Sequence, residues 1–222
     1  MPSAHYDDLI RIGFTPEMAQ FTVDADAKAQ ELREADPSLP FITAHVIASD
    51  LTSADRWHER IVSGEVEAER ATHLVGSYAR FQFALDHMPA EWVYENIADL
   101  WRGSDPNDTE VAYLKVWHEA KRHHRNRVIT DGKRLPKDNP LTVYRGETTV
   151  NTPTGIAWTL DLEIAKKFAR GAGIRVGNIK GYVLEAHVMR KDVLGYLTER
   201  GESEVVCDPN TLFGKRMKGL YE

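Results

Sequence analysis

The stretch LPKDNPLTVYRGE, residues 135–147, marks the point where the pattern of the chain changes. Before it, several segments carry apolar residues at helical spacing, whereas after it short β-type runs alternate with turn residues. The two prolines of this stretch and the Asp-Asn pair between them are typical of a turn or linker. Helices first and strands second predict an α+β fold, with a helical region over 1–135 and a strand-rich core over 136–222 that together form one compact unit.

The helical region contains recognisable helix starts and stops. Thr15 precedes Pro16 and Glu17, which is the order of an N-cap, a first helical residue and an acidic first turn. Later segments show apolar residues at helical spacing, or end at a proline or a glycine. We therefore expect further helices, and these cover residues 53–64, 65–88, 90–101 and 110–124.

The strand-rich region contains short runs of strand-forming residues with one helical segment among them. In the helical segment, 161–171, Asp161 is the expected N-cap, and Ile164, Ala165 and Phe168 are expected on an inward face. The predicted strands cover residues 141–146, 155–159, 181–188 and 203–207.

The composition excludes several classes of protein. With 42% hydrophobic and 28% charged residues, the chain has the composition of a globular protein. No apolar run approaches the roughly 18–20 residues needed to cross a bilayer, and the first residues lack the basic and apolar regions of a signal peptide. The single cysteine, Cys207, excludes an internal disulfide and a multi-cysteine zinc site. We therefore expect a cytoplasmic protein without a membrane partner.

Charge is distributed unevenly along the chain. A formal net charge of −6 argues against a protein that binds nucleic acid over its whole surface. In the segment 115–137, however, basic side chains outnumber acidic ones by eight to two, so this segment is either a solvated helix face or a contact for phosphate groups. His118 and His123 lie five positions apart instead of the four that a helical zinc motif needs, and no metal site is predicted.

Two carboxylates stand at the start of the last predicted strand. In extended backbone, residues i and i+2 face the same side, so Glu202 and Glu204 are expected to project together. Paired carboxylates suit glycosidic chemistry, in which an anion stabilises the positive charge that develops on a sugar ring. The alternative is a pair of solvated charges on an exposed turn.

Arg145 and Gly146 end the first predicted strand. A guanidinium presents a fork of hydrogen-bond donors that matches a phosphate, and a glycine lets a ligand approach the backbone closely. The alternative is a surface ion pair between Arg145 and the adjacent acids. The segment 155–169, a short strand with a Trp–Thr pair followed by an amphipathic helix, is either a third part of such a site or ordinary strand-to-helix packing.

In this order, the three elements resemble the active-site signature of bacterial and phage ADP-ribosyltransferases of the arginine–serine–glutamate type. That family has an aromatic–Arg–Gly strand, a Ser-Thr-Ser-like or Ser-Trp-Thr-like strand before a helix, and a Glu-x-Glu turn before an apolar strand. The resemblance covers roughly residues 141–208. The matching residues are Tyr144–Arg145–Gly146, Ala157–Trp158–Thr159 with Ala165, Phe168 and Ala169, and Glu202–Ser203–Glu204–Val205–Val206.

The resemblance implies a split β-sandwich core that holds NAD as a co-substrate. It assigns Arg145 to a phosphate of NAD and to the nicotinamide-side ribose, and the backbone of Gly146 to the carboxamide. Glu204 would be the catalytic glutamate at the ribose, and Glu202 would align or deprotonate the acceptor.

The middle element departs from the family pattern. Ala157 stands where the family has a serine that steadies the catalytic glutamate, and Thr159 would supply the missing hydroxyl. Tyr144 belongs to the same NAD-binding set. The candidates for stacking on nicotinamide, most of which are expected in the core, are Trp158, Phe168, Tyr182 and Tyr196.

These residues predict a NAD-dependent mono-ADP-ribosyltransferase, which cleaves the nicotinamide glycosidic bond and transfers ADP-ribose to a macromolecule. A protein arginine is the favoured acceptor because of Glu202, and a nucleic-acid base is the second choice because of the basic segment. The alternatives are a NAD glycohydrolase toxin with water as acceptor, and a non-catalytic binding module that retains the fold. The biological role fits a toxin, a phage effector or a bacterial regulator.

Overall fold

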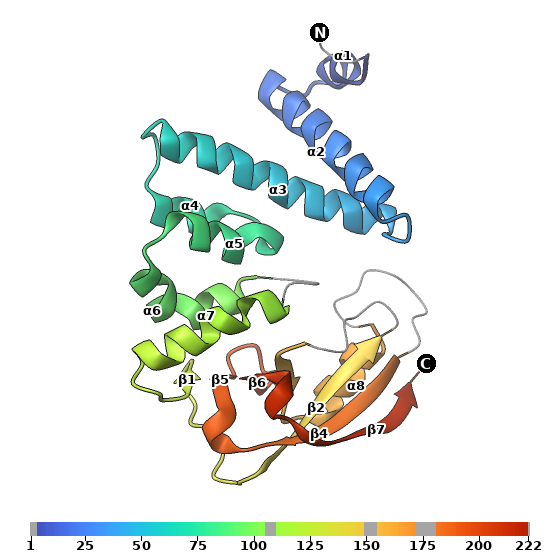
Figure 1. Ribbon diagram of the computed structural model, residues 1–222. Helices are drawn as coiled ribbons and strands as arrows, with labels where there is room; N and C mark the ends of the chain where they lie inside the picture. Colours follow the sequence, from blue (N-terminus) through green and yellow to red (C-terminus); the bar gives the residue numbers. More distant parts are fainter. Residues whose placement is uncertain (1–3, 105–109, 149–154, 172–180, 222) are drawn as a thin grey trace. The chain divides into compact units, whose positions relative to one another are not determined.

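The computed structural model describes residues 4–104, 110–148, 155–171 and 181–221 (Figure 1). The chain divides into two compact units, Met1–Met88 and Pro89–Glu222. The division lies at residue 88 instead of residue 135, because the two helices that follow Met88 pack with the strands. Trp117 in the second of these helices lies against Gly195 in a strand, where an added Cβ would come within 2.6 Å of the indole ring.

The described part of the first unit is helical. Thr15 caps the second helix, since its hydroxyl accepts a hydrogen bond from the Met18 N–H at 3.2 Å, and Pro16 is the first helical residue. Both predictions for this helix start are therefore confirmed. The helices of this unit are α1 (Ala4–Arg11), α2 (Pro16–Ala35), α3 (Phe41–Val62), α4 (Ala68–Leu74) and α5 (Ser77–His87).

Two predicted boundaries in the first unit are wrong. The helix expected from residue 53 begins at Phe41, directly after Pro40, so α3 is longer than its apolar spacing indicated. The single helix expected over 65–88 is interrupted at Gly76, where the Asp50 carboxylate accepts a hydrogen bond from the Tyr78 N–H at 2.9 Å. The chain turns there because this carboxylate caps the first turn of α5.

The second unit combines three helices with a mixed sheet in its described residues. The helices are α6 (Ala90–Arg102), α7 (Glu110–His123) and α8 (Leu162–Ala169). The strands are β1 (Ile129–Thr130), β2 (Leu141–Thr148), β3 (Ala157–Thr159), β4 (Gly181–Val188), β5 (Val193–Leu197), β6 (Glu204–Cys207) and β7 (Phe213–Tyr221).

The sheet has the strand order β1-β5-β6-β3-β2-β4-β7 (Figure 1). The β1–β5 pair is parallel, and the other neighbours are antiparallel. The four predicted strands and the helix after the second of them are present, whereas β1, β5 and β7 were not predicted. The described residues therefore form a mixed α and β fold with helices first and strands second.

Helix α8 packs closely on the sheet through small residues. Its N-cap is Asp161 as predicted, because the carboxylate accepts hydrogen bonds from the N–H groups of residues 163 and 164. Ala165 and Ala169 are fully buried against Val183, whereas Phe168 is 37% exposed. Phe168 therefore lies at the edge of the inward face, since its Cβ is close to Gly146 but the residue remains more than one third exposed.

None of the described helices is both long and apolar enough to cross a membrane.

Candidate functional site

The strand order brings the three candidate motif segments together. Strand β3 lies between β2 and β6, so each motif segment is a neighbour of the middle one. Tyr144 of β2 pairs with Thr159 of β3, and Thr159 pairs in turn with Glu204 of β6. Residues that are distant in sequence thus form one continuous row across three strands.

The pairing also fixes the side of the sheet on which each side chain lies. Directly opposed residues of antiparallel strands share a face, so Tyr144, Thr159 and Glu204 lie on one face. Arg145 follows Tyr144 in the same strand, and successive side chains alternate. The structure therefore brings Thr159 and Glu204 together and puts Arg145 on the opposite face of the neighbouring strand.

Arg145 lies in a buried polar environment where β2 and β3 separate. Its Nε donates to Glu147 Oε1 at 2.6 Å, and its Nη1 donates to the Ala157 carbonyl at 2.6 Å. The side chains of Arg145 and Glu147 are 11% and 1% exposed, so the ion pair expected with an adjacent acid exists but is not on the surface. Gly155 leaves the space for the guanidinium, because a Cβ there would overlap it.

Thr159 organises the backbone of the glutamate turn instead of a carboxylate. Its hydroxyl donates to the carbonyl of Glu202 and accepts from the N–H of Asp161 at 3.0 Å. A hydroxyl has one hydrogen to donate. The expectation that Thr159 donates to Glu204 in place of the missing serine therefore does not hold in this structure.

The two glutamates do not share the simple strand geometry that was expected. Strand β6 begins at Glu204, and Ser203 before it has a φ of 47°. The rule that residues i and i+2 face the same side needs extended backbone, which a left-handed residue interrupts. Glu202 therefore belongs to the turn, and only Glu204 belongs to the strand.

Glu204 receives a hydrogen bond from a residue that the sequence did not single out. The indole Nε1 of Trp101, in the last turn of α6, donates to Glu204 Oε1 at 2.7 Å. Trp101 is only 5% exposed. Its position on the apolar side of a predicted helix indicated burial, but nothing in the sequence connects it with β6.

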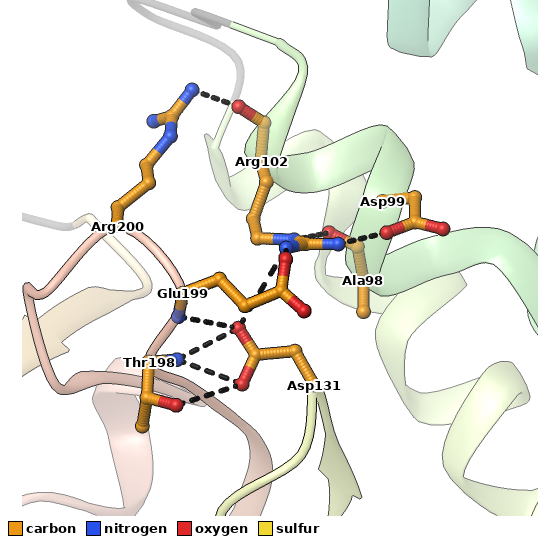
Figure 2. Close-up of polar contacts among 7 residues, drawn as sticks. All are labelled: Ala98, Asp99, Arg102, Asp131, Thr198, Glu199 and Arg200. Carbon is orange, nitrogen blue, oxygen red and sulfur yellow. Dashed lines mark hydrogen bonds and ion pairs between the residues drawn. The ribbon is translucent and has the colours of Figure 1, made fainter.

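Asp131, directly after β1, holds the turn that leads to the glutamates (Figure 2). Its carboxylate accepts from the Thr198 N–H at 2.8 and 2.7 Å, from the Thr198 hydroxyl at 3.1 Å and from the Glu199 N–H at 2.9 Å. The Asp131 side chain is 1% exposed. A buried carboxylate with several donors fixes the backbone of this turn.

Arg102 joins α6 to the same turn (Figure 2). Its guanidinium forms ion pairs with Asp99 in its own helix and with Glu199 in the turn, and lies 4.0 Å from Asp131. The carbonyl of Arg102 accepts a hydrogen bond from the Arg200 guanidinium. Two consecutive residues of α6, Trp101 and Arg102, therefore contact β6 and the turn before it.

The remaining aromatic candidates differ in accessibility. Trp158 is 3% exposed and its indole N–H donates to the Gly155 carbonyl at 3.2 Å, so it belongs to the core. Tyr196 is in the same core cluster, whereas Tyr144 packs against the α8 side and Tyr182 is half-buried. Phe168 is thus the most exposed aromatic side chain of the set.

Two other groups have clear structural roles. Burial raises the pKa of the Cys207 thiol to about 12, so this residue is protonated and unreactive at neutral pH. In the basic segment, Lys121 Nζ donates to the carbonyls of Lys191 and Val193 at 2.6 and 2.7 Å, and burial lowers its pKa. Arg125 and Arg127 of that segment are exposed.

The described residues thus offer an oriented carboxylate on one face of the sheet and a buried guanidinium beside the neighbouring strand. Among them, no group of three His, Cys, Asp or Glu side chains is arranged to hold a metal ion. Comparison with family models, with curated proteins and with solved structures finds no match for the chain.

Proposed function

We propose that this protein is a NAD-dependent mono-ADP-ribosyltransferase with an ADP-ribosyltransferase-like core. The observation that carries the proposal is the strand order β6-β3-β2, since the segments that resemble the family signature are adjacent strands. Strands β2 and β3 are consecutive and such strands often pair, so the β3–β6 pairing between segments distant in sequence is the stronger support.

Glu204 is the catalytic carboxylate in this proposal. As the bond between the ribose C1′ and the nicotinamide nitrogen breaks, the bonding electron pair leaves on nicotinamide and positive charge develops on the ribose. A carboxylate held beside the ribose stabilises that charge more strongly than it stabilises the ground state. The buried Trp101 N–H keeps one oxygen of Glu204 in a defined position, as this role requires.

Arg145 contacts the dinucleotide through a phosphate. A guanidinium binds phosphate oxygens in a forked geometry, and the buried Glu147 carboxylate at 2.6 Å holds the planar group in place. Strand alternation puts Arg145 and Glu204 on opposite faces, so the proposal requires one NAD molecule to reach both side chains at the point where β2 and β3 separate.

Glu202 directs the acceptor. It lies in the turn before β6 and is half-buried, with its backbone fixed by the Thr159 hydroxyl. The acceptor nucleophile forms the new bond to C1′, and its proton passes to the Glu202 carboxylate. A protein arginine is the acceptor we favour; exposed Arg125 and Arg127 make a nucleic-acid base the second candidate.

The test is incubation of a bacterial lysate with NAD labelled in its adenylate part. The native chain should label a macromolecule, and Glu204→Gln should lower the rate at least about 100-fold, because the developing charge loses its anion. Glu163→Gln is the matched control, since the Glu163 side chain is 69% exposed and lies in α8. Equal labelling by the native chain and Glu204→Gln would contradict the proposal.

The fate of the label distinguishes the acceptors. Label that is removed by protease indicates a protein, and label removed by nuclease indicates a nucleic acid. Release of nicotinamide without any labelled macromolecule would make water the acceptor and the protein a NAD glycohydrolase. Intact NAD after long incubation would overturn both enzyme assignments and favour a binding module.

A further inference from the structure

We infer that Trp101 is the positioning residue for Glu204, and that the last turn of α6 thereby takes the place of the serine hydroxyl missing from β3. This inference rests on the proposed function for the role of Glu204 and adds a residue outside the three motif segments. The contact joins Trp101 Nε1 and Glu204 Oε1 at 2.7 Å, the length of a charge-assisted hydrogen bond.

Aromatic neighbours fix the direction in which the Trp101 N–H points. Its ring meets Tyr113 edge-on at 6.4 Å between centroids and Trp117 edge-on at 5.8 Å. Trp117 itself is fully buried and lies over Gly195 of β5, where no side chain could fit. A ring held on several sides has little rotational freedom, so its N–H is already aimed at the carboxylate before a substrate binds.

The hydroxyl groups of β3 do not perform this task. Position 157 is an alanine, and the hydrogen of the Thr159 hydroxyl is donated to the Glu202 carbonyl. An indole N–H can only donate a hydrogen bond, so it favours the ionised form of Glu204. It cannot accept a hydrogen bond from the protonated carboxyl group. A carboxylate accepts up to about four hydrogen bonds, so the bond to Trp101 is compatible with a second bond to the ribose.

The residue after Trp101 fixes the turn in the same way. Arg102 pairs with Glu199, and its carbonyl accepts from Arg200 (Figure 2). The end of α6 therefore orients the catalytic carboxylate through one residue and the acceptor turn through the next. A displacement of α6 would move both together.

Trp101→Phe tests the inference against a matched control. It removes the N–H from the bond to Glu204 and keeps most of the ring. Trp117→Phe removes a similar part of the same cluster, but the Trp117 Nε1 is buried without a hydrogen-bond partner among the described residues. Trp101→Phe should lower kcat roughly 10- to 100-fold with little change in KM for NAD, and Trp117→Phe should leave kcat within about 3-fold.

The pH dependence separates positioning from packing. Without the indole donor the ionised carboxylate is less favoured, so the acidic limb of the kcat profile should move to higher pH in Trp101→Phe and stay in place in Trp117→Phe. Equal effects of the two substitutions on kcat and on the profile would overturn the inference, because packing alone would then explain them.

A readout that does not depend on turnover keeps the two proposals apart. In the native full-length chain, the indole N–H signal of Trp101 in NMR spectra should titrate with Glu204, and Glu204→Gln should abolish that titration. This measurement needs no substitution at Trp101. If Glu204→Gln abolishes the titration but the native chain does not turn over NAD, the contact is retained and the proposed enzyme function is rejected. If Glu204→Gln leaves the indole signal of Trp101 unchanged, the contact itself is rejected.

Discussion

In the first unit, Met1–Met88, helices pack through alanines, whereas the second unit, Pro89–Glu222, buries carboxylates beside its strands. The helices α2 and α3 meet at Ala29, Ala44 and Ala48, all fully buried. Among the described residues, the buried polar side chains of the first unit are threonines, while Glu147 and Glu185 are buried in the second. The interiors of the two units therefore have different chemistry.

Burial of a carboxylate is unfavourable unless partners replace its water. Glu185 accepts from Lys218 and from Arg216 Nε, the latter at 2.7 Å, and these bonds lower its pKa although burial opposes them. Asp131 receives its donors from a turn, as described above. Under the proposed function, the chemistry belongs to the second unit, which contains Arg145 and Glu204.

The largest expected difference between the units is the loss of folding stability when a tightly packed glycine is replaced by alanine. Gly146→Ala in β2 would force a Cβ onto the Ala165 carbonyl oxygen and to 2.5 Å from the Ala169 nitrogen. These are backbone atoms of α8 and cannot move away without displacing the helix. We expect a loss of about 3 kcal/mol or more in the free energy of unfolding, measured by urea denaturation of the full chain.

Gly76→Ala in the first unit is the comparison for this substitution. The added Cβ meets the Asp50 carboxylate, which is the end of a side chain and can rotate away at the cost of its hydrogen bond to the Tyr78 N–H. The expected loss is about 1 kcal/mol. A larger loss for Gly76→Ala than for Gly146→Ala would contradict the contrast between rigid and adjustable contacts.

A second contrast concerns the capping aspartates of the two units. Asp131→Ala should leave the N–H groups of Thr198 and Glu199 without their buried acceptor and cost about 2 kcal/mol. Asp50→Ala removes the bond from the Tyr78 N–H and should cost about 1 kcal/mol. Hydrogen exchange of amides in residues 198–201 should accelerate in the first variant and not in the second.

The same pair of variants tests the link between the turn and activity. If the turn before β6 directs the acceptor, Asp131→Ala should reduce labelling of macromolecules more than it reduces nicotinamide release. Asp50→Ala should change neither. If Asp131→Ala labels macromolecules at the native rate although the amides of residues 198–201 exchange rapidly, the turn does not direct the acceptor.

The strands that were predicted are those with a strong local pattern. β4 has the bounds expected from GYVLEAHV, and β2 begins at the expected Leu141. Strand β5 was missed because its five residues are all buried and carry no alternation. Strand β7 was missed because its lysines and arginine are typical of an edge strand, and edge strands have weak hydrophobic patterns.

The candidate site could be predicted only where it consists of sequence motifs. Arg145, Thr159 and Glu204 could be selected because each lies in one of the three segments that resemble the family signature. Trp101 could not, because its bond to Glu204 depends on where α6 packs, which no local pattern reports. The turn geometry at Ser203 was equally out of reach, since a non-glycine residue with a φ of 47° has no reliable signature.

The smallest expected effect is a pH dependence in the first unit. The Nε2 atom of His87, in α5, lies 3.3 Å from Nδ1 of His58. Burial and this neighbouring histidine lower the pKa of His87. Because the folded form then binds a proton less readily than the unfolded form, the stability of this unit should fall as the pH drops below about 6.5. His87→Asn should flatten this dependence.

The change should be less than about 1 kcal/mol, because His87 is only half-buried and solvent screens the interaction. Amide exchange in α5, corrected for its intrinsic pH dependence, measures it at pH 7.5 and 5.5. His58→Asn is the paired variant, since it removes the neighbour but leaves the burial of His87, and it should flatten the dependence only in part. If both variants kept the native pH dependence, a titrating group elsewhere in the first unit would be responsible. The interior of that unit would then contain a buried ionisable group in addition to its alanines, and the contrast with the second unit would be weaker.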